Sequence, residues 1–191
     1  ITAWAWIKNR DSTDDHIIVD RVRGVNNVWE SNTNDTAYTN TNTVQRFLQR
    51  GVQIGNDVTV NTADEGYVLW QWLLGTSAGT GTTTSPAGTI ASTSIVADTG
   101  HFSIGTYTGT GADNATVGHG LGGAPEMIIV RNLSRSTYGL VWHTNGGGAT
   151  HTADFAANAT FSANATKFGG SDATNPTANV FKIGTHNEIN A

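Results

Sequence analysis

The chain has 191 residues, a formal net charge of −5 and no cysteine, which excludes disulfides and thiolate metal sites. Only 13% of its residues are charged and no basic run occurs, which argues against nucleic-acid binding. No apolar run reaches the ~18 residues of a membrane span, so none is expected. Glycine supplies 23 residues, and asparagine and threonine fill many polar positions. These residue types favour turns and pleated strands over long helices.

Two tryptophan-rich segments of the first half alternate with a period of two residues. Trp4 and Trp6 alternate with alanine and isoleucine, and Trp70 and Trp72 alternate with leucine and glutamine. Residues i and i+2 of a strand point to one face, so each pair shares a face. Tryptophan buries a large area. We therefore expect all four rings to lie mostly in a core.

The middle of the chain contains a predicted helical turn, a linker and a lead-in strand. One helical turn is predicted for residues 44–49, ended by Gly51. Thr76 to Thr84 is a Gly/Ser/Thr tract typical of a flexible linker, and residues 90–96 predict a short strand leading into the second half. The predicted organisation is a first unit over residues 1–75, a linker with its lead-in strand over 76–100, and a second unit over 101–191.

Short strands also dominate the second half. Residues 102–107 alternate, and residues 127–130 and 140–142 are apolar runs bounded by glycine or polar residues. Many short strands with frequent turn signals are typical of antiparallel sandwiches. The predicted fold class is all-β, with jelly-roll-like antiparallel β-sandwich units in tandem and little helix.

The sequence repeats itself. Residues 181–191 echo residues 52–62, because both read apolar-x-Ile-Gly-x-x-x-x-branched-Asn, and residues 128–132 echo residues 5–9. The offsets are 183 − 54 = 129 and 131 − 8 = 123, which indicates a unit of about 125 residues. We expect a window cut from a longer polypeptide of tandem domains, in which the first unit lacks its N-terminal strands and the second lacks its C-terminal strand.

Motifs that could carry chemistry are weak. Residues 118–123 fit G-x-G-x-x-G, but Pro125 and a strand-like run follow where a dinucleotide site needs a helix, so a turn is predicted. The six histidines are scattered, and no nucleophile motif is present. The sequence therefore predicts no enzyme, no catalytic residue and no cofactor.

Acidic residues gather at positions 11–15 and 64–65. Solvated turns are the preferred interpretation of such runs. Calcium is the alternative, because Asp57, Asn61 and Asp64 lie on one loop and supply oxygen ligands. No EF-hand spacing is present, so no metal site is predicted.

Two other tryptophans are the candidates for a binding role. Trp29 and Trp142 are flanked by polar or glycine-rich segments, which suggests exposure. Exposed aromatic rings can stack on sugars or on a partner protein. Trp29 and Trp142 are therefore the predicted carbohydrate or partner contacts.

The chain resembles a known family through a string of motifs. Residues 103–111, 115–121 and 124–132 resemble a repeated domain of virion proteins in marine phages, especially those of cyanobacteria. The later part of that domain is similar to residues 4–10, 16–24, 39–45 and 67–72. The resemblance implies a tail fibre or another virion appendage, and it brings no catalytic residues.

The expected function is a structural component of a phage virion, with a tail fibre or similar appendage for host attachment preferred. A capsid decoration protein and a carbohydrate-binding module of a surface protein remain as alternatives. The expected partners are copies of the chain in a homo-oligomer, with a trimer among the options, other virion proteins and a host surface glycan. The expected location is the virion.

Overall fold

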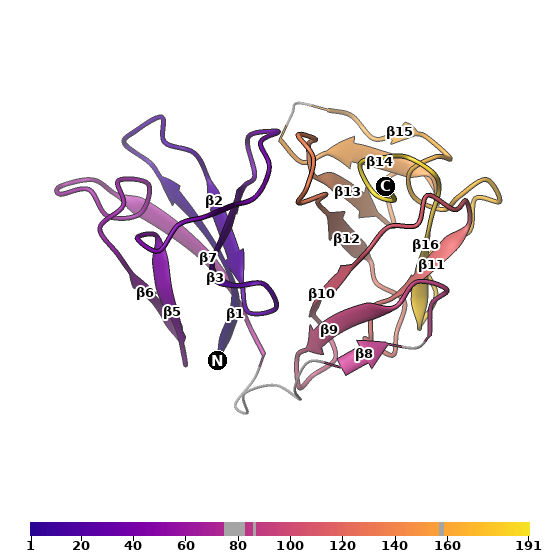
Figure 1. The fold of residues 1–191 in the computed structure, drawn as a ribbon, viewed down its shortest axis with the longest axis horizontal. Coiled ribbons are helices and arrows are strands. Elements are labelled where there is room, and N and C mark those ends of the chain that lie inside the picture. The colour runs from indigo at the N-terminus through magenta and orange to yellow at the C-terminus, as the bar shows by residue number, and fades with distance from the viewer. Residues whose placement is uncertain (75–82, 86, 157–158) are drawn as a thin grey trace.

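The computed structural model describes residues 1–74, 83–85, 87–156 and 159–191. The described residues form strands β1 to β16 and no helix, which confirms the all-β prediction. Their strand pairings are antiparallel, and only an isolated bridge between Ile90 and Val117 is parallel. Figure 1 shows the two halves of the chain side by side, with the N-terminus in the first and the C-terminus in the second.

Strands β1 to β7 belong to the first half, and β8 to β16 to the second. The first group is β1 (Thr2–Asn9), β2 (Ile17–Asp20), β3 (Gly24–Glu30), β4 (Tyr38–Thr39), β5 (Val44–Leu48), β6 (Gly51–Ile54) and β7 (Tyr67–Leu73). The second is β8 (Thr83–Ser85), β9 (Ser92–Val96), β10 (Ser103–Tyr107), β11 (Ala115–Gly118), β12 (Met127–Val130), β13 (Leu140–His143), β14 (His151–Asp154), β15 (Ser162–Ala163) and β16 (Val180–Ile183).

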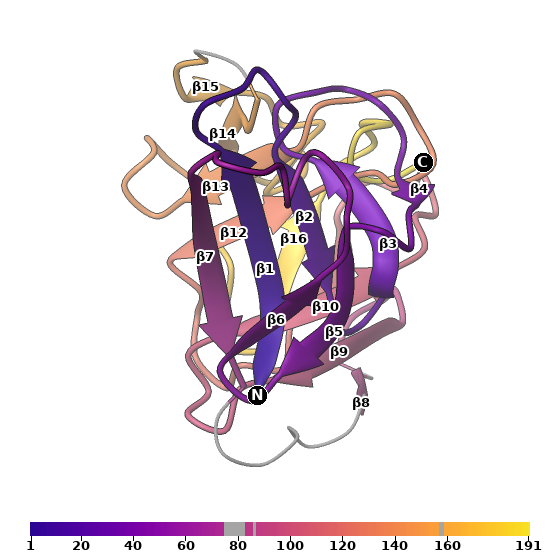
Figure 2. The same ribbon diagram turned by 90° about the vertical axis from the view of Figure 1, so that its left-hand side faces the viewer.

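The first half is a five-stranded sheet covered on one face by a hairpin. The sheet order is β4-β3-β2-β1-β7, and the hairpin pairs β5 with β6. Figures 1 and 2 show the hairpin lying over the sheet. Ala5 and Ile7 of β1 face it and pack in one core with Val44 and Phe47 of β5. The small and branched side chains of β1 thus occupy this core.

The helical turn predicted for residues 44–49 is wrong, because this segment is strand β5. Its pairing with β6 shifts register between Val44 and Arg46, as at a β-bulge. The extra residue changes the phase of the strand, so Val44 and Phe47 are both buried although they are three residues apart. A bulged strand therefore reproduced the spacing of a helical turn.

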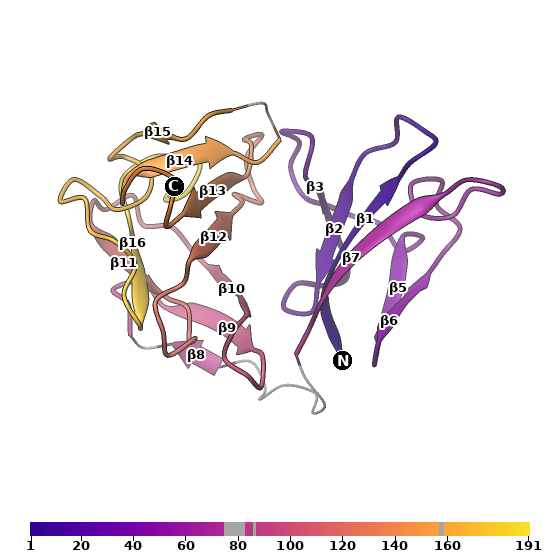
Figure 3. The same ribbon diagram turned by 180° about the vertical axis from the view of Figure 1, so that it is seen from behind.

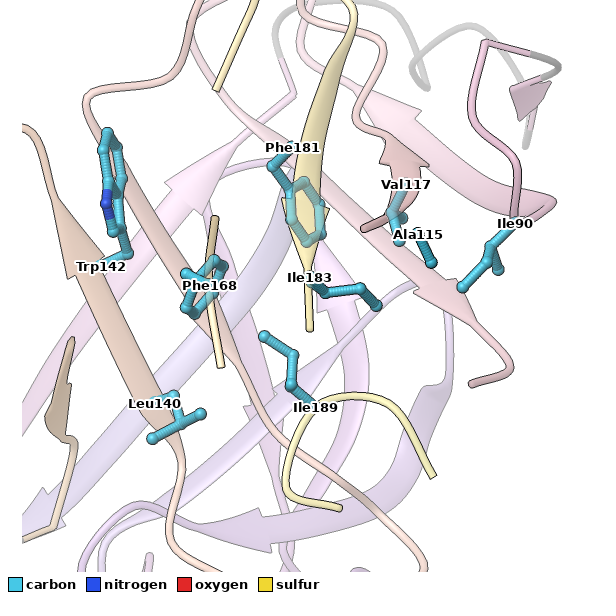
Figure 4. Close-up of a cluster of buried hydrophobic side chains, with 9 residues drawn as sticks. All are labelled: Ile90, Ala115, Val117, Leu140, Trp142, Phe168, Phe181, Ile183 and Ile189. Carbon is cyan, nitrogen blue, oxygen red and sulfur yellow. The ribbon is translucent and has the colours of Figure 1, made fainter. Parts of the chain in front are cut away.

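The second half consists of three sheets, and its own core is built mainly by residues of β11, β13 and β16. Their orders are β12-β13-β14-β15, β11-β16 and β10-β9-β8. Figure 3 shows β12 to β15 at one end of this half and β8 to β10 at the other. Its buried core is shown in Figure 4 and comprises Ile90, Ala115, Val117, Leu140, Trp142, Phe168, Phe181, Ile183 and Ile189.

The strand pairing of the first-half sheet recurs in the β12–β15 sheet of the second half, with residue numbers shifted by a nearly constant amount. Ile7 pairs with Ile17 between β1 and β2, and adding 123 to both numbers gives the pair Val130 and Leu140 between β12 and β13. The next strands repeat as well. The β3–β4 pair of Val28 with Tyr38 becomes, on adding 124, the β14–β15 pair of Thr152 with Ser162.

The turns that follow β6 and β16 also match. Asn61 Nδ2 donates to the carbonyl oxygen of Gly55 over 2.8 Å, and Asn190 Nδ2 donates to that of Gly184 over 2.8 Å. These are the residues of the sequence echo. A side-chain amide thus closes both turns by binding the carbonyl six residues earlier.

The matching strands differ in their neighbours within the sheet. In the described part of the chain, β1 lies between β2 and β7, whereas β12 has only β13 as a sheet neighbour. Similarly, β16 pairs with β11, whereas β6 has only β5. As a result Ile54 of β6 is 39% exposed, while the matching Ile183 of β16 is fully buried.

The linker prediction falls largely outside the described residues, which omit 75–82 and 86. Thr83–Ser85 form β8, which pairs with β9 in the sheet of β10. The lead-in strand predicted for residues 90–96 is found as β9. The division into two units remains a prediction.

Candidate ligand-binding cavity

Four tryptophans form a cross-strand ladder on the sheet face that points away from the β5–β6 hairpin. Trp4 and Trp72 have ring centroids 4.4 Å apart, and Trp6 and Trp70 have centroids 5.0 Å apart. The predicted burial of these rings is wrong for β7, because Trp70 is 43% and Trp72 37% exposed. The core face of β1 is already occupied by its alanines and isoleucine. The tryptophan face is therefore turned toward the second half.

Aromatic residues of the second half meet this ladder. Phe155 lies with its ring centroid 5.2 Å from that of Trp6 and 5.9 Å from that of Trp29. Phe102 stacks on Trp72 at 6.2 Å with an interplanar angle of 27°. These contacts fix the two halves against each other on both sides of the ladder.

A buried apolar cluster joins the halves near the N-terminus. Ala3 and Leu74 of the first half pack with Ile95 and Ala97 of the second. The backbone N–H of Asp98 donates to the carbonyl of Leu74 over 2.7 Å. This cluster holds β1 and the end of β7 against β9.

Between these contacts lies a cavity of about 1410 Å³ that is partly open to solvent. Trp4, Trp6, Trp29 and Trp72 line it from the first half, and residues of β10 and β12 line it from the second. Its volume exceeds the roughly 300–1,000 Å³ of ordinary small-molecule pockets. The cavity is therefore large enough for an extended ligand.

An ion pair between Arg23 and Asp20 lies in the cavity lining together with the tryptophans. Arg23 Nε lies 2.5 Å from Asp20 Oδ2, and the two side chains are only 9% and 5% exposed. Asp20 is directly opposite Trp4 in the β1–β2 pairing, so its side chain is on the tryptophan face. Both residues line the cavity. The turn after β2 thus places Arg23 in the same cavity lining as the tryptophans.

Several donors around the cavity have no partner. Arg23 Nη1 and Nη2, Trp6 Nε1 and Arg131 Nε are buried and make no hydrogen bond among the described residues. An unpaired buried donor costs about 1–3 kcal/mol, more when charged. These four unpaired atoms are all donors, which favours acceptor oxygens of a ligand beside them, although Glu126 and Glu188 also line the cavity.

Arg131 connects the second half to the loop after β3. Its Cζ lies 5.6 Å from the ring centroid of Trp29, and its Nη1 donates to Thr33 O over 3.1 Å. A further bond joins Nη2 to Asp35 O. Burial lowers the pKa of Arg131, and the charges of Asp35 and Glu30 oppose that effect. Arg131 therefore connects the end of β12 to the loop after β3, beside the cavity that it lines.

Comparison with known proteins gives one match. A family model described as a domain of unknown function, DUF7483, matches residues 2–191. The chain belongs to the DUF7483 family. No curated protein and no solved structure matches the chain.

The two tryptophans predicted as contacts are covered in this DUF7483 domain. Trp29 is 6% exposed and packs against Phe155 and Arg131, although it lines the cavity. Trp142 is 3% exposed, donates from Nε1 to Gly148 O over 3.2 Å and lies in the core of Figure 4. Their expected exposure is wrong because both rings are on strand faces that pack inward.

The cavity residues missed by sequence analysis are Asp20, Arg23 and Arg131. Their polar partners come from a turn and from residues about 100 positions away. Neither arrangement leaves a local pattern in the sequence. The only available signal was the shared face of Trp4 and Trp72 with Asp20, which required the strand register.

The acidic clusters of the DUF7483 domain meet at a buried amide. Asn9 is fully buried, and its Nδ2 lies 2.9 Å from Asp14 Oδ2 and 2.5 Å from Glu65 Oε2. Asp11 accepts the backbone N–H of Gly66 over 2.5 Å. The described residues contain no group of three His, Asp or Glu side chains suited to a metal ion. These carboxylates serve as hydrogen-bond acceptors between loops.

The glycine-rich segment 118–123 connects β11 to β12 without a helix, as the sequence predicted. Gly120 and Gly122 have φ angles of +74° and +73°, which glycine adopts readily. In the described part of the DUF7483 domain, no helix is long and apolar enough to cross a membrane.

His119 of this segment predicts a pH dependence. It is 8% exposed, and burial lowers its pKa below 6.5, while its contact with Thr177 O opposes that effect. Below pH 6.5 the unfolded chain therefore binds more protons than the folded one at this site. We expect the stability contributed by neutral His119 to be lost as pH falls below 6.5. Urea unfolding at pH 7.5 and 5.5 measures this, and His119→Gln should reduce the difference between them. An unchanged difference in the variant would reject the assignment.

Proposed function

We propose that this chain is a structural, non-enzymatic component of a phage virion, with a tail fibre or similar appendage preferred. We infer that it contains parts of two jelly-roll-like β-sandwich units in tandem. The observation that carries the proposal is the repeated register of β1–β4 and β12–β15, at offsets of 123 and 124 residues. Repeated units that stack along one direction are suited to an elongated structural protein. The motifs resembling phage virion proteins supply the viral context.

Open strand edges support assembly with further copies. In the described part of the chain, β12 and β6 each lack the neighbour that their counterparts β1 and β16 possess. An open edge offers unpaired N–H and C=O groups to another chain. We infer that the strand which the second unit is expected to lack is supplied beside β12 by another copy, as β7 is supplied beside β1 within one chain. The proposed assembly is a homo-oligomer, and a fibre would favour a trimer.

This assembly can be tested at β12. Ile128 and Val130 pack toward the core, whereas Met127 is 50% exposed. A lysine at an edge disfavours pairing with another strand. We expect Met127→Lys to raise the dissociation constant for self-association by about tenfold or more. Sedimentation velocity over a concentration series measures this.

The matched control is Tyr138→Lys, which places the same charge at a position that is 37% exposed and outside the strands. This control should associate like the original chain. A chain that stays monomeric at every concentration would contradict assembly through β12, and so would equal effects of the two variants.

A carbohydrate-binding module is the second candidate, and the aromatic cavity favours it. Ring faces of tryptophan and a few polar groups in a concave site are the usual elements of small-ligand recognition. The two candidates are compatible, because a fibre that attaches to a host can carry a glycan site.

A further inference from the structure

We propose that the cavity between the two halves binds an acidic oligosaccharide, with a sugar carboxylate received by Arg23 and a sugar ring packed on Trp72. The inference gives the host-attachment part of the proposed function its ligand class. It does not depend on self-association.

The guanidinium of Arg23 favours an acidic ligand. Its Nε is held by Asp20, whose Oδ1 also accepts the backbone N–H of Arg23 over 2.9 Å. The carboxylate is thus engaged by this one residue at both oxygens. The Nη1 and Nη2 atoms keep the parallel pair of donors that matches a carboxylate. A carboxylate supplies two acceptors and a compensating charge.

Neighbouring donors have the same preference. Trp6 Nε1 and Arg131 Nε belong to residues lining the same cavity, and both are buried without a partner among the described residues. Sugar hydroxyl and ring oxygens accept hydrogen bonds from such groups. A ligand rich in acceptors therefore fits this wall better than an apolar one.

The aromatic rings of the cavity favour a sugar. Trp72 is 37% exposed, and its ring contacts those of Trp4 and Phe102. The negative face of an aromatic ring attracts the C–H groups on one face of a pyranose. The cavity of about 1410 Å³ has room for more than one sugar unit.

Binding includes a small local movement. The Nη atoms of Arg23 are buried from solvent in this structure, so they must turn to reach a ligand in the cavity. The Arg23 guanidinium can rotate while its Nε keeps the hydrogen bond to Asp20. The outer indole of Trp72, on edge strand β7, can shift to admit the sugar.

The test uses trigalacturonate as the probe and its methyl ester as the uncharged match. Isothermal titration calorimetry on the full chain should give saturable binding of the acid with a Kd below about 1 mM. The ester should bind about tenfold more weakly or worse, because it cannot make a charged pair with Arg23. Equal binding of acid and ester would overturn the proposal, as would no saturable binding of the acid.

Matched variants assign the site. Arg23→Lys keeps the charge but loses the planar pair of donors, so the Kd should rise about tenfold. Trp72→Ala should raise the Kd by a similar factor. It leaves the Arg23–Asp20 ion pair in place, so it still tests the site if Arg23→Lys fails to fold. The controls are Arg46→Lys, at an exposed position of β5, and Phe161→Ala, which removes an exposed aromatic ring; neither residue lines the cavity. Weakening by the controls equal to that by the site variants would overturn the proposal.

These experiments separate the two ideas. The binding assay uses its own variants, Arg23→Lys and Trp72→Ala, because Met127 itself lines the cavity and Met127→Lys would add a charge there. Loss of self-association with intact trigalacturonate binding would leave the cavity site standing. If trigalacturonate does not bind while self-association is intact, the cavity proposal is rejected and the proposed assembly is not.

Discussion

Replacing Asn190 by alanine should lower the free energy of unfolding by about 3 kcal/mol or more. Asn190 is fully buried and makes four hydrogen bonds to backbone groups. Its Nδ2 donates to Ala112 O and Gly184 O over 2.7 and 2.8 Å, and its Oδ1 accepts from the N–H groups of Thr110 and Gly111 over 2.7 and 3.0 Å. Alanine would leave all four groups without this partner. Urea unfolding followed by circular dichroism measures the loss.

Asn61 is the matched control for this substitution. It occupies the corresponding place after β6 but is exposed, and its side chain bonds only to Gly55 O among the described residues. Water can replace that bond, so Asn61→Ala should cost no more than about 1 kcal/mol. Equal losses in the two variants would show that the buried network around Asn190 does not determine stability.

Gly184→Ala is the second change expected to have a large effect. A Cβ at this position would lie 2.6 Å from Ala165 O and 2.6 Å from both C and O of Thr166. These are backbone atoms, so the loop before β16 would have to move. We expect a loss of about 3 kcal/mol, at the upper end of overpacking effects. Thermal unfolding of the variant measures it.

Gly51→Ala provides the comparison, because a Cβ there has no heavy atom within 4 Å. It should stay within about 0.5 kcal/mol of the original chain, as surface substitutions usually do. A similar loss at both glycines would contradict the steric explanation.

The strand content and the repeated turn were predictable from local sequence. Period-two alternation around Trp4 and Trp6 indicated a strand, and β1 contains both. The echo of Ile54 and Ile183 indicated a repeated unit, and both segments form a turn closed by the same asparagine-to-carbonyl hydrogen bond. In both cases the signal lies within about ten residues.

The burial of the tryptophans was not predictable in the same way. Alternation assigns Trp4 and Ala5 to opposite faces but does not say which face the hairpin covers. Here the smaller residues of β1 pack under β5 and β6, and the larger rings meet the second half. The choice depends on the volumes available in distant parts of the chain.

The candidate cavity depends even more on long-range contacts. Arg23 comes from a turn in the first half, whereas Phe102 and Arg131 come from the second. Each is an ordinary polar or apolar residue in its own segment. Only the docking of the halves combines a paired guanidinium, unpaired donors and aromatic rings into one site.

Immunogold electron microscopy of purified phage particles, with antibody raised against this chain, tests the virion role most directly. The proposed function predicts gold particles on tail fibres or a similar appendage. Label over the capsid surface would contradict the fibre assignment and favour a capsid decoration protein. Particles without label, with the chain found only free in the infected-cell extract, would contradict a structural role in the virion.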